Sequence, residues 1–225
     1  MKRVALTLLG VLSVSVGAFG QVIIADWTFE TSQPNVMNQT ILTGINPEVG
    51  AGTASAVHAN AATDYSSPSG NGSAHSFSAN TWSVGDYYQF QVSTVGDMGI
   101  QVSWNQTRSA TGPASWNFAY GLNGVDFTVA LGGYTANSIT WSNSAPAGGS
   151  SFSVDLSSVS ALDNASSVYF RISAATAAGG PAGTARVDDF QVTATPVPEP
   201  REYAMVAGLG LIGFCVFRRR ALKRV

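Results

Sequence analysis

The sequence contains one cysteine, Cys215, and few charged residues. A single thiol cannot form an intrachain disulfide or a thiolate metal site, so the fold must be held by its core. Charged residues make up 11% of the chain and hydrophobic residues 45%, which excludes a disordered polyelectrolyte. The 24 glycines are too many for a helical protein.

Basic residues are nearly absent from the middle of the chain. Residues 21–196 hold three arginines and no lysine against eleven acidic residues, a balance of 3 − 11 = −8. A phosphate backbone needs clustered cations, so this balance excludes nucleic acid as a partner. The remaining basic residues lie at the two ends beside apolar runs, which is typical of membrane topology signals.

The usual catalytic motifs are also missing. His58 and His75 are the only histidines; neither lies in a zinc-binding pattern, and both are expected at the surface. There is no Gly-x-Ser-x-Gly, and no phosphate-binding glycine loop with a lysine. The acidic residues allow many carboxylate pairs of the kind glycosidases use, but their spacing selects none. We therefore predict a protein that is not an enzyme and has no resident cofactor.

The N-terminus has the pattern of a secretory signal peptide. Lys2 and Arg3 precede an apolar run, Val4 to Ala18, and Ala18-Phe19-Gly20 supplies the small residues that signal peptidase requires. We predict a signal helix over residues 1–20, with cleavage before Gln21. A retained N-terminal anchor is the alternative.

The C-terminus has a second apolar run. Residues 203–217 carry no charge, and Arg218, Arg219 and Arg220 follow directly. Positive flanks stay cytoplasmic, so we predict a single transmembrane helix over residues 203–217 with its C-terminus inside the cell. Fifteen residues are few for a span, since a bilayer core needs about 20.

A proline-rich segment precedes this run. Pro198-Glu199-Pro200, then a short apolar segment rich in glycine and leucine, then Arg218, Arg219 and Arg220, resembles the PEP-CTERM sorting signal of Gram-negative bacteria. The resemblance covers residues 196–225. It implies that an exosortase recognises the Pro-Glu-Pro triplet and that the protein is then released or re-attached at the cell surface. Arg201-Glu202 departs from the family pattern, which leaves the cleavage position open. A plain anchor behind a proline-rich stalk is the alternative.

Residues 21–195 alternate between apolar and polar positions. A period of two predicts strands with one buried face, and it places Trp104 and Trp116 in the core. The alternating runs are 87–92, 99–106, 115–121, 125–130, 151–156 and 167–173. Asn123-Gly124, between two of these runs, predicts a hairpin. Residues 156–167 are expected to form a short helical turn or a loop between sheets.

Many short strands separated by Gly/Pro turns predict an all-β domain, a two-sheet antiparallel jelly-roll sandwich. "ADWTFE" near its start and "GTARVDDFQVTA" at its end resemble the first and last strands of jelly-roll carbohydrate-binding modules. In such modules the terminal strands lie side by side, and their carboxylates can hold a structural calcium. The resemblance implies Glu30, Asp188 and Asp189 as calcium ligands here.

Exposed aromatic rings are the usual platforms for sugars. Trp82, beside a turn, and Trp141, in "ITWSNS", lie outside the alternating runs and are our candidates for binding glycan; a structural role for both is the alternative. Three functions remain: an exosortase-sorted structural or adhesive protein of the cell surface or matrix, a module that binds extracellular polysaccharide, and a surface glycan-cleaving enzyme. The first is our interpretation. Exposed coplanar aromatics favour the second, and a cleft with paired carboxylates favours the third.

Mass spectrometry of the surface-located protein tests the predicted cleavage at both ends of the chain. We expect an N-terminus at Gln21 and a C-terminus that precedes Val225. A chain that begins at Met1 contradicts the signal peptide, and a chain that still ends at Val225 contradicts exosortase processing and leaves only the plain anchor.

Overall fold

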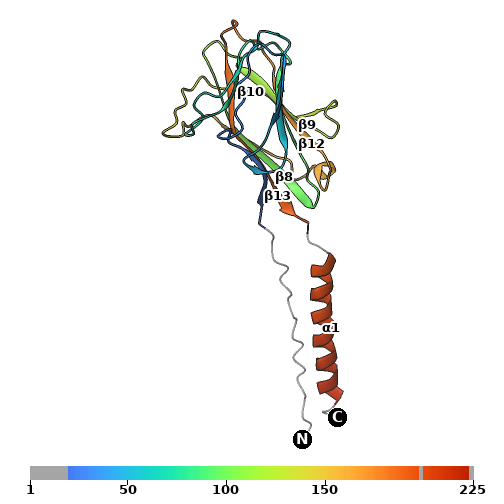
Figure 1. Ribbon diagram of the computed structural model, residues 1–225. Helices are drawn as coiled ribbons and strands as arrows, with labels where there is room; N and C mark the ends of the chain where they lie inside the picture. The colour runs from blue at the N-terminus through green and yellow to red at the C-terminus, as the bar shows by residue number, and fades with distance from the viewer. Residues whose placement is uncertain (1–19, 198–199, 223–225) are drawn as a thin grey trace. The chain divides into compact units, whose positions relative to one another are not determined.

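The structure is a computed structural model that describes residues 20–197 and 200–222. Gln21–Pro196 is one compact unit, a sandwich of two antiparallel sheets (Figure 1). One sheet has the order β11-β8-β13-β1-β3, with β6 also paired to β13 and β5 to β6; the other has the order β10-β9-β12-β7-β4-β2. The strands are β1 Val22–Trp27, β2 Ile41–Ile45, β3 Val49–Gly50, β4 Thr53–Val57, β5 Tyr65–Ser66, β6 Phe77–Ala79, β7 Tyr87–Val92, β8 Asp97–Arg108, β9 Ser115–Gly121, β10 Thr128–Thr135, β11 Ser151–Asp155, β12 Val168–Ala174 and β13 Ala185–Pro196.

The period-two pattern predicted most of these strands correctly. In β7, Tyr88, Phe90 and Val92 are buried while the residues between them are half-exposed. Strands β8, β9, β11 and β12 coincide with the other alternating runs, and a 3-10 turn, η1 (Ser160–Leu162), lies in the predicted crossing segment. The all-β sandwich is therefore confirmed. From β7 to β9 and again from β10 to β13 the chain changes sheet at every step, which is consistent with jelly-roll winding.

The run 125–130 is an exception. Strand β10 begins only at Thr128, and Val125, an apolar position of the alternating run, is 77% exposed. The side-chain oxygen of Asn123 accepts the amides of Val125 and Asp126, which holds residues 122–127 in a wide loop. The hairpin predicted at Asn123-Gly124 is therefore confirmed, because β9 and β10 pair antiparallel, and the loop 122–127 connects them.

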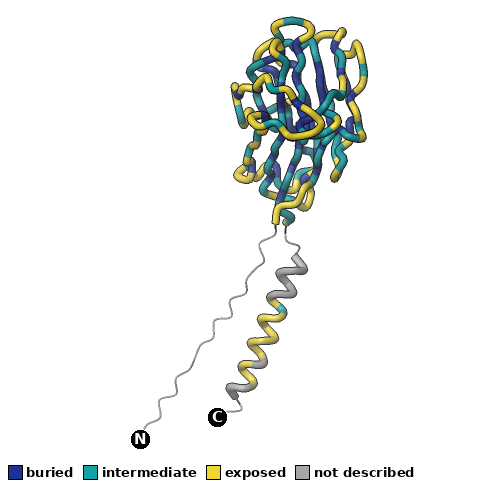
Figure 2. The backbone as a smooth tube through the Cα atoms, turned by 90° about the vertical axis from the view of Figure 1, so that its left-hand side faces the viewer, coloured by how far each residue is buried: buried dark blue, intermediate teal, exposed yellow. Residues whose placement is uncertain are grey.

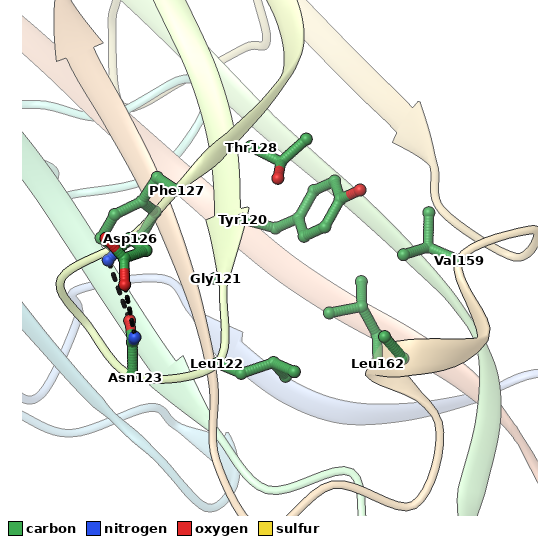
Figure 3. Close-up of a pocket in the computed structure, with 10 residues that line it drawn as sticks. Tyr120, Gly121, Leu122, Asn123, Asp126, Phe127, Thr128, Val159 and Leu162 are labelled. Atoms are coloured by element: carbon green, nitrogen blue, oxygen red, sulfur yellow. Dashed lines mark hydrogen bonds between the residues drawn. The ribbon is translucent and has the colours of Figure 1, made fainter.

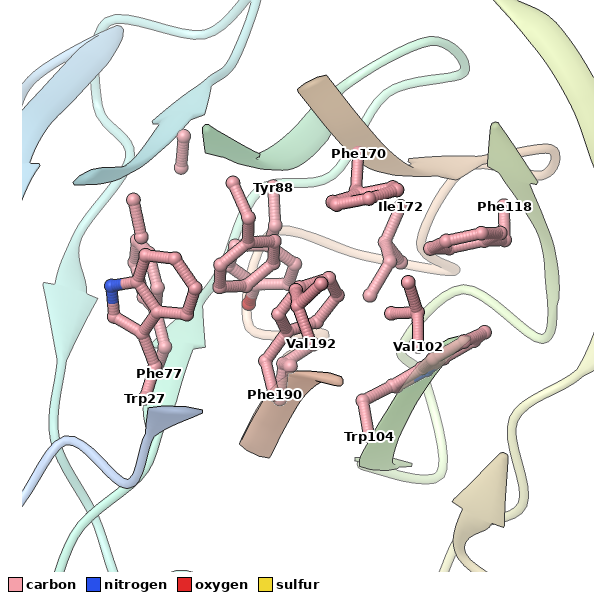
Figure 4. Packing of buried hydrophobic residues seen from close by; sticks show 14 of the residues in the cluster. Trp27, Phe77, Tyr88, Val102, Trp104, Phe118, Phe170, Ile172, Phe190 and Val192 are labelled. Atoms are coloured by element: carbon pink, nitrogen blue, oxygen red, sulfur yellow. The ribbon is translucent and has the colours of Figure 1, made fainter. Parts of the chain in front are cut away.

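Aromatic rings from the two sheets meet in the core (Figure 4). Phe90 of β7 and Phe190 of β13 stack with centroids 3.6 Å apart, and the ring of Trp27 meets the edge or face of both at 67–68°. Trp104 of β8 stacks on Phe118 of β9 at 4.8 Å. Figure 2 shows the buried positions in the interior of the sandwich and many exposed positions in the surrounding loops. Each aromatic pair of this kind contributes about 0.5–1.5 kcal/mol to stability beyond the effect of its buried area.

Three side chains that we expected at the surface are buried. Trp82 is 3% exposed, because its ring packs against Tyr88 and Trp116, and Trp141 is 4% exposed. His58 is 2% exposed and lies 4.1 Å from the Trp82 ring. The predictions of exposed Trp82, Trp141 and His58 are therefore wrong. The period-two pattern carries no information on them, because none lies in an alternating run.

The predicted C-terminal helix forms, as α1 (Pro200–Leu222). By length and hydropathy, however, none of the helices in the described part of the chain could cross a membrane. The transmembrane helix expected at 203–217 is thus unsupported; its uncharged run is shorter than the roughly 20 residues a span needs. Arg218 and Arg219 are exposed near the end of α1. The signal helix, Ala18, Pro198 and Glu199 fall outside the described residues, and so does the side chain of Arg220.

The buried His58 makes stability depend on pH. Its Nδ1 is 3.4 Å from Asp86 Oδ2, but neither ring nitrogen makes a hydrogen bond, and desolvation lowers the pKa of His58 to about 4. The unfolded chain binds a proton near pH 6.5 and the folded protein does not. The contribution of His58 to stability is therefore full above pH 6.5 and falls as the pH drops toward 4, by up to about 3 kcal/mol.

Denaturant unfolding at several pH values checks this expectation. In His58→Phe, the fall in the free energy of unfolding between pH 6.5 and 4 should be smaller than in the natural protein. The other titrating groups, Asp86 included, are common to both proteins, so only the difference between the two profiles reports on His58. Parallel profiles contradict the assignment.

Candidate functional site

A pocket lies where β9 leaves the sheet (Figure 3). It has a volume of about 400 Å³, within the roughly 300–1,000 Å³ of ligand pockets. The ring of Tyr120 extends from β9 toward Val159, and Leu162 of η1 forms an apolar wall. The remaining lining residues come from the loop and the start of β10: Gly121, Leu122, Asn123, Asp126, Phe127 and Thr128, with Ala161 beside η1.

The loop 122–127 gives the pocket its polar groups. Asn123 Oδ1 accepts the amides of Val125 and Asp126, each at 2.9 Å, and Asn123 Nδ2 donates to Asp126 Oδ2 at 2.9 Å. Gly124 has φ +72°, and a Cβ there would lie 3.3 Å from the ring of Tyr169. Glycine is therefore favoured at the point where the loop lies on β12. The amide and the carboxylate are held together near Phe127 (Figure 3).

Arg171 of β12 fastens this loop to the outer face of the sheet. Its Cζ lies 3.8 Å from the ring centroids of both Tyr87 and Phe127. Its Nη2 donates to the carbonyl of Gly124 at 3.2 Å and to Gln89 Oε1 at 2.7 Å. Burial lowers the pKa of Arg171, but a guanidinium remains cationic at neutral pH. Cation–π contact and hydrogen bonding together hold Phe127 at the rim of the pocket.

The pocket's residue types favour binding over hydrolysis. Two aromatic rings, an apolar wall and a few fixed polar groups are what a sugar ring with an apolar face and hydroxyl edges requires. Asp126 is the one carboxylate among the lining residues, whereas glycoside hydrolysis uses two. The lining also contains no cation.

The structure does not place the predicted glycan platforms in this pocket. Trp82 and Trp141 are buried, and neither lines it. Sequence reasoning did not identify Tyr120 and Phe127 as pocket-lining residues. Tyr120 shares the phase of Trp116 and Phe118 and packs against the core, but it is only half-buried and also lines the pocket. The signal available for Phe127 was its place in the segment that follows Asn123-Gly124.

The three predicted calcium ligands act as anchors for neighbouring chain segments. Asp188 is fully buried; its Oδ2 accepts the amide of Asn71 and the hydroxyl of Ser73, both at 2.7 Å. Glu30 Oε1 accepts the amide of His75 at 2.8 Å. Asp189, at φ +47° in a β-bulge of β13, accepts Asn105 Nδ2 at 2.9 Å. All three carboxylates therefore have hydrogen-bond donors directed at them.

The described carboxylates form no recognisable calcium site. Across residues 20–197 and 200–222, no group of three or more His, Cys, Asp or Glu side chains is close enough to hold a metal. Burial first, and then the charge of Asp189, raise the pKa of Asp188 to about 7. The calcium prediction therefore gains no support from the described residues.

Comparison with known proteins gives solved structures only. No protein-family model and no curated protein matches the chain. The CBM22-1 xylan-binding domain of Paenibacillus barcinonensis Xyn10C is 12% identical, with 81% of this chain and 100% of that chain covered and a TM-score of 0.46. The K3 cleaved adhesin domain of Lys-gingipain from Porphyromonas gingivalis is 16% identical, with 76% and 98% covered and a TM-score of 0.42. Because both TM-scores are below 0.5, we base no argument on these two likenesses.

Removing the Arg171 side chain should loosen the loop. We expect Arg171→Leu to lower the free energy of unfolding by about 1–3 kcal/mol, the sum of its lost cation–π contacts and hydrogen bonds. Limited chymotrypsin digestion should then cut faster at Leu122 and Phe127. Arg186→Leu is the matched control, because Arg186 donates to Ser69 and has no contact with this loop. Equal cleavage in both variants contradicts the role of Arg171.

Proposed function

We propose that this protein is a non-catalytic, exported surface protein that binds glycan in the pocket between β9, the loop 122–127 and η1. The observation that carries the proposal is that the half-buried aromatic residues Tyr120 and Phe127 line one pocket together with Asn123 and Asp126, whose side chains are hydrogen-bonded to each other. Rings stack on the apolar face of a sugar, and the polar pair meets its hydroxyls.

The proposed site is rigid before a ligand arrives, which supports a binding role. Arg171 holds Phe127, and the Asn123 side chain holds the loop backbone. A preformed site avoids the conformational entropy that ordering the loop on binding would cost. Leu122, Val125 and Val129 are 47%, 77% and 56% exposed on or next to this loop. They add apolar area beside the pocket against which a longer glycan could lie.

Glycan-array and affinity-electrophoresis measurements on residues 21–196 test the proposal; this compact unit contains the complete sandwich core. We expect at least one polysaccharide to bind. Tyr120→Ala and Asp126→Ala should each weaken binding about tenfold or more, equivalent to about 1.4 kcal/mol. Asp155→Ala is the matched control, because Asp155 is an exposed carboxylate on the opposite sheet.

The outcomes separate the alternatives. If no glycan binds, the proposal fails and the structural or adhesive role remains. If glycan binds equally well to every variant, the site lies elsewhere. Release of reducing sugar from a bound polysaccharide would overturn the non-catalytic assignment.

We also propose that the chain is exported by signal peptidase processing before Gln21 and is handled by an exosortase. The precursor would sit in the inner membrane with its C-terminus in the cytoplasm before transfer to the surface. The support is the order Pro198-Glu199-Pro200, short apolar segment, Arg218-Arg219-Arg220. The terminal masses described above test this proposal independently of glycan binding.

A further inference from the structure

The chain contains two Asn-Gly dipeptides in different surroundings, Asn71-Gly72 and Asn123-Gly124. An Asn-Gly pair can deamidate when the glycine nitrogen attacks the side-chain carbonyl carbon of the asparagine and closes a five-membered ring. The attack needs a free glycine N–H, an accessible side chain and stabilisation of the negative charge that develops on the carbonyl oxygen. Glycine imposes no side chain that would obstruct ring closure.

Asn123-Gly124 meets these three conditions. Asn123 is exposed at the loop. Its Oδ1 accepts two backbone N–H groups, those of Val125 and Asp126, each at 2.9 Å, which is the arrangement of an oxyanion hole. Within the described residues the N–H of Gly124 has no hydrogen-bond acceptor.

Asn71-Gly72 fails two of them. Asn71 is 6% exposed, and its backbone amide is held by Asp188. The N–H of Gly72 donates to the carbonyl of Ser142 at 2.9 Å, so the nucleophile is occupied. Asn71 Oδ1 accepts one donor, the amide of Ala147. Reaction here requires the loop to open first.

We propose that Asn123 is a site of spontaneous deamidation in the folded protein, with water as the co-reactant. The Gly124 nitrogen loses its proton and bonds to Cγ of Asn123. The bond from Cγ to Nδ2 then breaks, and ammonia leaves with the added protons. Water opens the resulting succinimide at either carbonyl, which gives aspartate or isoaspartate at position 123. The net change is one amide and one water converted to one acid and one ammonia.

The product alters the pocket of the proposed function. The hydrogen bond from Asn123 Nδ2 to Asp126 Oδ2 is lost, and two carboxylates face each other in its place. Isoaspartate also adds one methylene to the backbone at position 123. The loop is attached to β9 before this point, and Arg171 contacts it after this point, at Gly124 and Phe127. The added length therefore disturbs the position of the loop between these attachments. Deamidation should therefore weaken glycan binding. This consequence rests on the proposed function; the chemical step does not.

Peptide mapping of the full chain tests the chemical step. The folded protein is incubated at mildly alkaline pH, and residues 71 and 123 are each scored for the amide-to-acid mass change and for isoaspartate. We expect position 123 to react at least about tenfold faster than position 71, since the latter needs local opening. In denaturant the two rates should converge. Equal rates in the folded protein, or faster reaction at 71, overturn the proposal.

Two variants test the consequence. Asn123→Gln keeps an amide but places its carbonyl one methylene further from the attacking nitrogen, so it should resist the incubation that modifies the natural chain. Asn123→Asp reproduces one product and should bind glycan about tenfold more weakly than the natural protein. Unchanged affinity in Asn123→Asp refutes the link to the pocket. A protein that deamidates at 123 but binds no glycan at all sinks the proposed function and leaves the modification site standing.

Discussion

The stacking of aromatic rings between the two sheets is the contact on which the rest of this molecule depends. With its one cysteine in the C-terminal helix, the sandwich has no disulfide, and Phe90 on Phe190 and Trp104 on Phe118 join one sheet to the other. Stacked rings fix both the spacing and the lateral position of the sheets. The end of β9, where the pocket lies, takes its position from this packing.

On the outer side of the six-stranded sheet, the side chain of Arg171 holds the loop 122–127 in position. Its guanidinium stacks between the rings of Tyr87 and Phe127. A lysine could not replace it, because an ammonium group has no planar face to place between two rings. The loop gains a defined position without being part of the sheet. Its polar residues can therefore be exposed and still be held in one arrangement.

Buried polar groups serve as anchors for loops at the opposite sheet. Asp188 lies under the segment that contains Gly70, Asn71 and Ser73, and Asn71 in turn holds Ala147. Gly70 packs so closely on the Asp188 carboxylate that a Cβ would not fit. The same contacts protect Asn71-Gly72, while Asn123-Gly124 lies open. Identical dipeptides thus differ in chemistry because of what packs on them.

The sequence by itself determined the strands that carry a period of two, and with them the all-β class and the burial of Trp104 and Trp116, because a pleated strand alternates its side chains whatever lies around it. It also determined the charge of the domain. Only the tertiary structure decided that Trp82, Trp141 and His58 are buried, that β10 starts at Thr128, and that Tyr120 and Phe127 share a pocket. The burial of these side chains and the position of the loop depend on contacts between segments that are distant in sequence, such as Arg171 and Phe127. A local sequence pattern contains no information on which distant segment packs against it.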